Sequence, residues 1–425
     1  MDRKMKDSRV KWIGEIPEHW RVSPMKNFMS FINGYAFKSS DLLTEGKYPV
    51  IKIGDFNING IDFRNANYCN IDYEILKNYS IKKEDILIAM SGGTVGKIVY
   101  VNDTVEDAFI NQRVGIIRAT NSKFIYYVLS TGEFLKYVYL LAGGTAQPNI
   151  STNSINKYKF AIPGIEEQRK IVNLLDGKTY QVNSIIKNTK VSIEEIKRYK
   201  QSVITEAITK GLNHKVDMKE TDVDWIGKVP VHWNAMKTKY IFKVEKRIAN
   251  EEGHVILSVT QKGLKVRDIS KNEGQISADY SKYQFVNVGD FVMNHMDLLT
   301  GWVDHSKLEG VTSPDYRVFK FINDSNYSAD YYKYIFQMCY SNKIFYGMGQ
   351  GVSNLGRWRL QTDKFINFVL PVPSLEEQNE IVLFLNSKCA HIDSLIEQKR
   401  KLINELENYK SSLIFEYVTG KKEVL

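Results

Sequence analysis

An internal repeat constrains the fold of this chain more than any other feature. Residues 10–20 read VKWIGEIPEHW and residues 223–233 read VDWIGKVPVHW, so seven of the eleven positions are identical. The chain has only six tryptophans, and four of them fall in these matched segments. A second match, at an offset of 210, relates residues 163–209 to residues 373–419, which begin with PGIEEQ and PSLEEQ. The repeat therefore predicts two tandem halves of similar construction.

The matched segments divide each half into an opener, a variable block and a helical block. The stretches between the matches, roughly 21–161 and 234–371, share almost no sequence similarity. We predict an α+β fold, with two tandem mixed α/β domains separated by two long helices. The expected boundaries are 1–161 for the opener with the first variable domain, 162–212 for the first helical spacer, 213–371 for the second opener with its variable domain, and 372–425 for the second spacer.

Helical periodicity runs through both helical blocks. Residues 165–209 contain no proline, and Gly177 is their only interior glycine. The carboxylates of Glu166 and Glu167 suit the first turn of a helix because they face its positive dipole end. Beyond Gly177, apolar residues alternate by steps of four and three, which is the spacing of a coiled-coil seam. The seam positions are Val182, Ile186, Thr189, Ile193, Ile196, Lys200, Val203 and Ala207, then Ile392, Ile396, Lys399, Ile403, Leu406, Lys410, Leu413 and Tyr417.

Two matched seams in one chain predict that the helices pair with each other as a coiled coil. The alternative is that each helix only packs on its own domain. An antiparallel pair would relate the two halves by an approximate two-fold axis, and Lys200 and Lys410 at one shared seam position would favour a single register. About 30 helical residues span roughly 45 Å, somewhat more than one DNA turn of about 34–36 Å.

Composition sets the class of protein. The 425 residues are 43% hydrophobic and 25% charged, which is typical of globular domains. The first residues lack the apolar core of a secretory signal, and no apolar run approaches the roughly 18 residues of a membrane span. Three widely spaced cysteines disfavour a disulfide framework or a cysteine zinc site, so we expect a cytoplasmic protein. A net charge of +9 permits, without requiring, nucleic-acid binding.

Each variable block ends in a glycine-rich polar loop, at residues 143–151 and 347–359. Amide and guanidinium side chains on such loops suit the reading of base edges, since Asn and Gln pair with adenine and Arg pairs with guanine. A surface loop shaped only by its glycines is the alternative at any one position. The candidate DNA-binding residues are Lys97, Gln112, Arg113, Gln147, Asn149, Gln350, Asn354, Arg357 and Arg359.

Catalytic motifs are absent from the sequence. The segment at 91–98, SGGTVGKI, fails as a phosphate loop because its first position is serine and its last is isoleucine. The glycines at 347–351 lack the dinucleotide-binding spacing, and the seven histidines show no metal-ligand arrangement. His19 and His232 lie in the repeated opener, where a structural role is expected. We therefore predict no catalytic residues and no metal site.

The duplicated openers, divergent blocks and P-x-x-E-E-Q helical repeats together resemble the specificity (S) subunit of bacterial type I restriction-modification systems. The resemblance covers the whole chain in the expected order. Further matching motifs lie at 85–97, 111–113 and 147–149 in the first half, and at 289–292, 313–316 and 356–359 in the second.

The resemblance implies that the variable blocks are target-recognition domains, each reading one half of a bipartite double-stranded DNA target. It also implies that the helices form the spacer and dock two modification (methyltransferase) subunits, joined by two restriction (motor and nuclease) subunits. S-adenosylmethionine, ATP and Mg²⁺ would be bound by those partners, with no cofactor in this chain. Because the two blocks differ, we expect an asymmetric target for this defence system.

Two other functions remain open at this level. A self-contained DNA methyltransferase or nuclease would show activity as the purified single chain. A scaffold built on the coiled coil, with no sequence-specific role, would bind duplex DNA regardless of its sequence and with a strong salt dependence.

Overall fold

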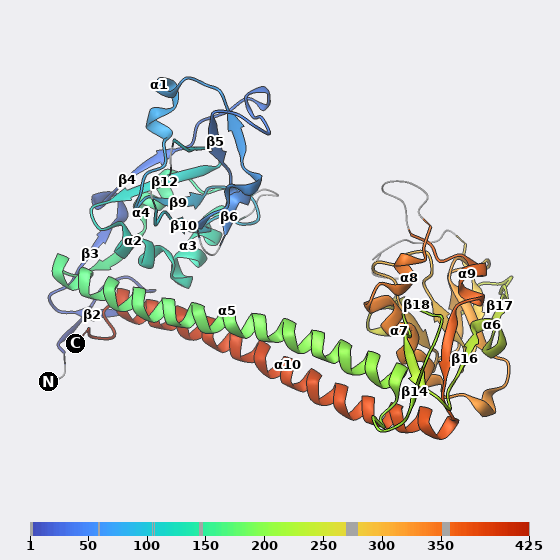
Figure 1. Cartoon of the computed structure of the whole chain (residues 1–425). Coiled ribbons are helices and arrows are strands. Elements are labelled where there is room, and N and C mark those ends of the chain that lie inside the picture. The colour runs from blue at the N-terminus through green and yellow to red at the C-terminus, as the bar shows by residue number, and fades with distance from the viewer. Residues whose placement is uncertain are drawn as a thin grey trace. The chain divides into compact units, whose positions relative to one another are not determined.

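The computed structural model describes residues 3–57, 60–103, 105, 107–143, 148–268, 279–350 and 358–424 (Figure 1). The chain forms two compact units. The first unit comprises residues 1–189 and 400–425, and the second comprises residues 190–399. Each unit thus combines one opener, one variable block and a part of each helical block.

A four-stranded antiparallel sheet forms the centre of the first unit, in the order β10-β9-β12-β4. These strands span Ile98–Tyr100, Ile86–Ala89, Val114–Ala119 and Met29–Asn33. All four residues of β9 are buried, which explains why the strand reads as a continuous apolar run. Helices α2 (Ser122–Leu129) and α3 (Gly132–Ala142) contribute apolar side chains to the same core.

Smaller elements complete the first unit. A second sheet has the order β11-β5-β8, with strands Phe109–Ile110, Tyr48–Ile51 and Asn67–Cys69. The hairpins and short helices are β1 (Met5–Asp7), β2 (Glu15–Pro17), β3 (Arg21–Pro24), β6 (Phe56–Asn57), β7 (Gly60–Ile61), α1 (Tyr73–Leu76), α4 (Thr152–Lys157) and β13 (Lys159–Ile162). Strand β13 pairs with β3, so the end of the variable block returns to the opener.

The second unit has a central antiparallel sheet in the order β22-β21-β24-β17. Its strands span Val303–His305, Phe291–Met293, Arg317–Phe321 and Phe242–Glu245, and α7 (Ala329–Ser341) packs against β22. The other elements are β14 (Met218–Glu220), β15 (Lys228–Pro230), β16 (Asn234–Lys237), α6 (Thr238–Ile241), β18 (Leu257–Thr260), β19 (Gly263–Val266), β20 (Gln284–Val286), β23 (Gly310–Thr312), α8 (Ile344–Gly347), α9 (Thr362–Ile366) and β25 (Val369–Val372).

The two variable blocks share one architecture despite their dissimilar sequences. The strand order of the central sheet is the same in both units when the strands are matched along the chain. A buried aspartate precedes the central strand in each unit: Asp85 accepts from the Lys82 N–H at 2.7 Å, and Asp290 accepts from the Asn287 N–H at 2.8 Å. Each carboxylate also pairs with an arginine of its own unit. The predicted mixed α/β fold of both blocks is confirmed.

Two long helices supply the helical blocks, α5 (Ile165–Lys210) and α10 (Leu375–Val418) (Figure 1). Within the first unit, the Lys410 Nζ donates to Asn183 Oδ1 at 2.9 Å. Within the second unit, the Lys200 Nζ donates to both carboxylate oxygens of Asp393 at 2.7 Å. In the first unit, Leu175 near the start of α5 shares a core with Tyr417 near the end of α10. In the second unit, Ile208 near the end of α5 shares a core with Ile381 near the start of α10. The helices therefore run antiparallel in both units. Lys200 and Lys410 therefore each have a polar partner on the other helix.

The seam positions are shielded from solvent along both helices. Ten of them are buried: Val182, Ile186, Thr189, Ile193, Ala207, Ile392, Ile396, Ile403, Leu413 and Tyr417. The other six are half-buried: Ile196, Lys200, Val203, Lys399, Leu406 and Lys410. Gly177 lies inside α5 without interrupting the helix.

The repeated opener and the repeated helix start meet in each unit. The Trp20 indole N–H donates to Glu167 Oε2 at 2.9 Å, and the His19 Nε2 lies 2.9 Å from the same oxygen. In the second unit the Trp233 indole N–H donates to Glu377 Oε1 at 3.1 Å, and the His232 Nε2 lies 2.8 Å from it. Both tryptophans are fully buried. The opener motif and the motif at the helix start thus contact each other in each unit, and we call this contact the junction.

The Glu377 carboxylate makes the stability of this junction dependent on pH. Burial alone would raise the pKa of Glu377, but hydrogen bonds from His232, Trp233 and Ser374 outweigh it and hold the pKa below the ordinary value of 4.5. A carboxyl with a lowered folded-state pKa stabilises the fold above its unfolded pKa and loses that contribution as the pH falls through the folded value.

We expect Glu377→Gln to lower the free energy of unfolding by about 1–2 kcal/mol at neutral pH, because it weakens hydrogen bonds to a charged acceptor. The difference from the wild type should shrink as the pH falls from about 5 to about 3. Denaturant unfolding across that range measures it. Glu376→Gln is the matched control, since this exposed neighbour loses the same charge in the same helical turn. Equal effects of the two variants at all pH values would contradict the prediction.

Candidate nucleic-acid interface

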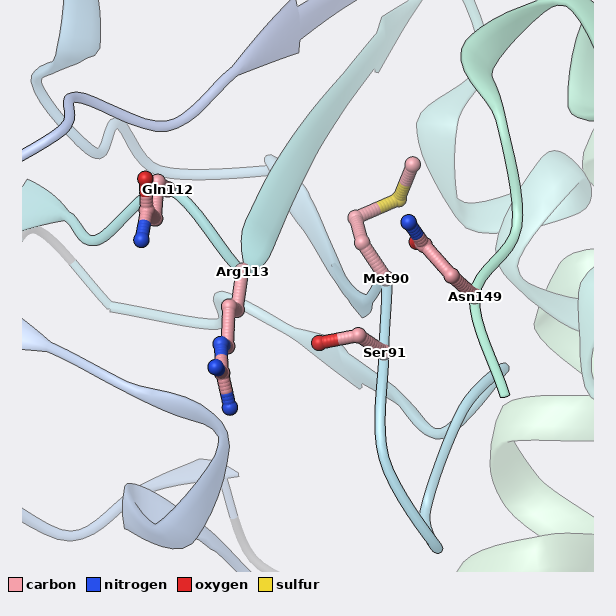
Figure 2. Close-up of a pocket in the computed structure, with 5 residues that line it drawn as sticks. All are labelled: Met90, Ser91, Gln112, Arg113 and Asn149. Carbon is pink, nitrogen blue, oxygen red and sulfur yellow. The ribbon is translucent and has the colours of Figure 1, made fainter. Parts of the chain in front are cut away.

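A cavity of about 310 Å³ opens in the first unit where three segments of the variable block meet. Met90 and Ser91 follow the end of β9, Gln112 and Arg113 precede β12, and Asn149 precedes α4. Figure 2 shows the Ser91 side chain between those of Arg113 and Asn149. We call this cavity the first groove.

Backbone hydrogen bonds hold the three segments of the first groove together. The Met90 N–H donates to the Arg113 carbonyl at 2.9 Å, and the Ile150 N–H donates to the Met90 carbonyl at 2.9 Å. The Gly92 N–H donates to the Pro148 carbonyl, also at 2.9 Å. The side chains that line the groove therefore project from a fixed backbone, which suits the reading of a rigid partner.

The polar side chains of the first groove are available to a ligand. Gln112, Arg113 and Asn149 are exposed, and their side chains make no hydrogen bond or ion pair within the described part of the chain. The buried Ser91 hydroxyl likewise has no hydrogen-bond partner among the described residues. Together these groups present a guanidinium, two amides and a hydroxyl without a neutralising carboxylate. That set of donors and acceptors matches the edges of DNA bases and backbone phosphates.

The second unit places two exposed candidates side by side. The backbones of Gln350 and Arg359 pair with each other, with N–H to carbonyl distances of 3.1 and 3.2 Å. The Gln350 side-chain oxygen accepts from the Gln361 amide at 3.3 Å. The next residue after Arg359 is anchored to the end of the central strand, because the Leu360 N–H donates to the His295 carbonyl at 2.9 Å.

The buried side chains of His295 and Arg317 interact electrostatically with Arg359. Burial, followed by the charges of Arg317 and Arg359, lowers the pKa of His295 to about 3. Burial and then the charge of Arg359 lower the pKa of Arg317 to about 10, against a raising effect of Tyr340. His295 is thus neutral at physiological pH, while Arg317 stays charged. This part of the second unit favours an electron-rich or anionic partner.

Comparisons with known proteins support the resemblance to type I specificity subunits. Residues 17–195 match the type I restriction modification DNA specificity domain. A putative type I restriction enzyme MjaX specificity subunit from Methanocaldococcus jannaschii is 25% identical, covering 97% of this chain and 96% of the relative. The EcoBI specificity subunit of Escherichia coli is 22% identical, covering 99% of this chain and 90% of the relative. The chain is thus similar over almost its whole length to specificity subunits of type I restriction enzymes.

Two solved structures share the fold of this chain. A chain from a structural study of complex assembly in the type I R-M system has a TM-score of 0.67 at 13% identity, and the match covers 96% of this chain and 99% of that chain. The HsdS subunit from Thermoanaerobacter tengcongensis has a TM-score of 0.50 at 13% identity, with 96% and 98% covered. The chain therefore shares its fold with these type I R-M proteins.

The structure locates the candidates predicted from the sequence as follows. Gln112, Arg113 and Asn149 meet in the first groove. Lys97 does not line that groove, and its ammonium donates to the Phe56 carbonyl at 2.7 Å. Three candidates, Gln147, Asn354 and Arg357, lie outside the described residues.

Sequence reasoning missed other residues near these sites. Met90 and Ser91 line the first groove, although the sequence offered Ser91 only as part of a failed phosphate loop. The sequence analysis considered His295 only as a possible metal ligand and set it aside. It missed Arg317, because nothing in the sequence shows that this strand-start arginine is buried near a loop arginine. Within the described ranges, no cluster of three or more His, Cys, Asp or Glu side chains could hold a metal ion. No helix in that part of the chain has the length and apolar character that a membrane crossing requires.

Proposed function

We propose that this specificity subunit reads an asymmetric, bipartite DNA target, with one recognition unit for each half-site. The observation that carries the proposal is the combination of a shared sheet order with different exposed polar side chains. The first unit presents Gln112, Arg113 and Asn149, and the second presents Gln350 and Arg359. Equivalent scaffolds with different readers would select different half-sites, whereas identical readers would favour a palindrome.

The antiparallel helices would set the distance between the half-sites and dock the partner subunits. We propose two modification (methyltransferase) subunits and two restriction (motor and nuclease) subunits as those partners. The structural neighbour from a type I R-M system, whose study concerns complex assembly, supports a role within a complex. S-adenosylmethionine, ATP and Mg²⁺ would be bound by the partners, and the DNA target would place the complex in the cytoplasm.

We infer that this subunit does not itself catalyse methylation or cleavage. The first groove contains amides, a guanidinium and a hydroxyl, and no carboxylate or imidazole among its lining residues could act as a general base. Its contribution is to bring partner enzymes to one DNA sequence. Positioning of this kind needs the rigid, hydrogen-bonded segments that form the groove.

Mapping N6-methyladenine across the host genome, with and without this gene, tests the proposal. We expect deletion to abolish methylation at one asymmetric bipartite motif and leave all other motifs unchanged. The control is re-expression of the gene from a plasmid, which should restore the same motif. Purified subunit mixed with the modification subunit should methylate the same sequence in vitro. Sequence-independent, salt-sensitive binding in that mixture would instead support a scaffold without recognition.

A further inference from the structure

The hairpin that borders the candidate site has the same construction in both units. In the first unit, the Ala89 N–H donates to the Lys97 carbonyl at 2.8 Å across the β9–β10 hairpin. In the second unit, the Asn294 N–H donates to the Trp302 carbonyl at 2.9 Å across the β21–β22 hairpin. Because the paired residues are eight positions apart in both cases, Ala89 and Asn294 occupy equivalent places.

The segment that follows each glycine-rich loop docks on this hairpin in the same way. The Ile150 N–H donates to the carbonyl of Met90, the residue after Ala89, at 2.9 Å. The Leu360 N–H donates to the carbonyl of His295, the residue after Asn294, at 2.9 Å. A short helix follows in each unit, α4 or α9. Ile150 and Leu360 are therefore structurally equivalent, although no similarity between the variable blocks indicates it.

The residues immediately before these anchors are Asn149 and Arg359. Both are exposed, and neither side chain has a hydrogen bond or ion pair within the described ranges. Asn149 lines the first groove beside Arg113. Arg359 acts electrostatically on Arg317 and His295. The same backbone position thus carries an amide in one unit and a guanidinium in the other, and neither group has a hydrogen-bond partner among the described residues.

These two side chains have different preferred bases in the major groove of DNA. An Asn side chain suits adenine, because its amide N–H donates to adenine N7 while its carbonyl oxygen accepts from the adenine N6 amino group. An Arg guanidinium offers two parallel donors, which match the O6 and N7 acceptors of guanine. The buried Arg317, which interacts electrostatically with Arg359, adds a second positive charge, whereas its sheet-register equivalent in the first unit is Gly115. That charge further favours an acceptor-rich partner in the second unit.

We propose that Asn149 and Arg359 are equivalent base-reading residues, Asn149 reading an adenine in one half-site and Arg359 reading a guanine in the other. This inference rests on the proposed function, because it assigns residues to the reading of a bipartite target. It also explains how two units with one architecture select different half-sites.

Exchanging the two side chains tests the inference. With the methyltransferase partner present, Asn149→Arg is expected to replace an adenine by a guanine at one position of one half-site in the methylated motif. Arg359→Asn is expected to replace a guanine by an adenine in the other half-site. Each change should alter base preference by about tenfold to a hundredfold, which corresponds to one bidentate contact.

Matched controls lie at the opposite end of each central sheet. Asn102 follows the far end of β10, and Lys307 follows the far end of β22, where both side chains are exposed. Asn102→Arg and Lys307→Asn introduce charge changes of the same sign as the two test variants. We expect both controls to leave the motif unchanged, which would separate base reading from a general electrostatic effect.

Alanine variants cover the case in which an exchange abolishes methylation. Asn149→Ala and Arg359→Ala are expected to relax one base position each, in opposite half-sites, when the purified protein selects from random duplex DNA. Unchanged half-sites in all four variants would overturn the inference while a gene-dependent motif still upheld the proposed function. Relaxation of both half-sites by a single variant would also overturn it. Loss of the gene-dependent motif itself would count against the proposed function instead.

Discussion

Replacing Trp233 by alanine is expected to lower the free energy of unfolding by about 3–5 kcal/mol, the usual cost of deleting a large buried aromatic side chain. The indole is fully buried in a core shared with Ala207 and Ile208 near the end of α5 and with Ile381 and Leu385 near the start of α10. A backbone glycine also packs on the ring, because a Cβ atom at Gly211 would lie 3.1 Å from it. A smaller side chain at position 233 would therefore leave a cavity in this core.

Trp233→Phe separates packing from hydrogen bonding in the same position. It keeps a ring but loses the N–H that donates to Glu377 at 3.1 Å, so we expect a smaller loss of about 1–2 kcal/mol. Denaturant unfolding followed by circular dichroism measures both variants. If alanine and phenylalanine had equal effects, the hydrogen bond rather than the packed ring would dominate this junction.

The repeated residues were the most predictable part of the fold, since their partners are repeated with them. Trp20 meets Glu167 and Trp233 meets Glu377, so each half of the sequence carries both members of its contact. The sequence predicted a structural role for the opener histidines, but it did not reveal the glutamate that each one meets. That pairing joins residues about 145 positions apart, and local periodicity contains no information about it.

The similarity of the variable blocks was invisible in the sequence because the fold depends there on backbone geometry rather than on particular side chains. The turn before the central strand needs a positive φ, and Glu84 adopts 70° where Gly289 adopts 93°. The buried aspartate that follows pairs with Arg118 in one unit and Arg247 in the other, from different strands or segments. Different residues thus satisfy the same geometric requirement.

The candidate site was predictable only in its chemistry. Amide and guanidinium side chains on polar loops singled out Gln112, Arg113 and Asn149, but their assembly depends on hydrogen bonds between segments distant in sequence. Lys97 was also a candidate because of its positive charge, but its ammonium donates to the Phe56 carbonyl within the fold. Side-chain type alone therefore overstates the number of residues available to a ligand.

A balanced insertion in the two helices should change the spacing of the DNA target without changing its half-sites. One heptad lengthens an α-helix by about 10 Å, or roughly three base pairs of DNA. Lys200 pairs with Asp393 in the second unit, and this register places the junction 195/196 of α5 opposite the junction 397/398 of α10. Seven residues with the same seam pattern, inserted at both junctions, preserve the alternation by four and three.

We expect the methylated motif of the balanced variant to keep both half-sites and gain about three base pairs in its gap. A single insertion in α5 alone leaves its seven added residues without a partner on α10, so it should abolish methylation and lower the stability of the helix pair. Methylome sequencing of cells that express each variant with the methyltransferase partner measures both outcomes. Altered half-sites with an unchanged gap would show that the helices do not set the spacing, because a spacer can move the two recognition units apart without touching the residues that read the bases.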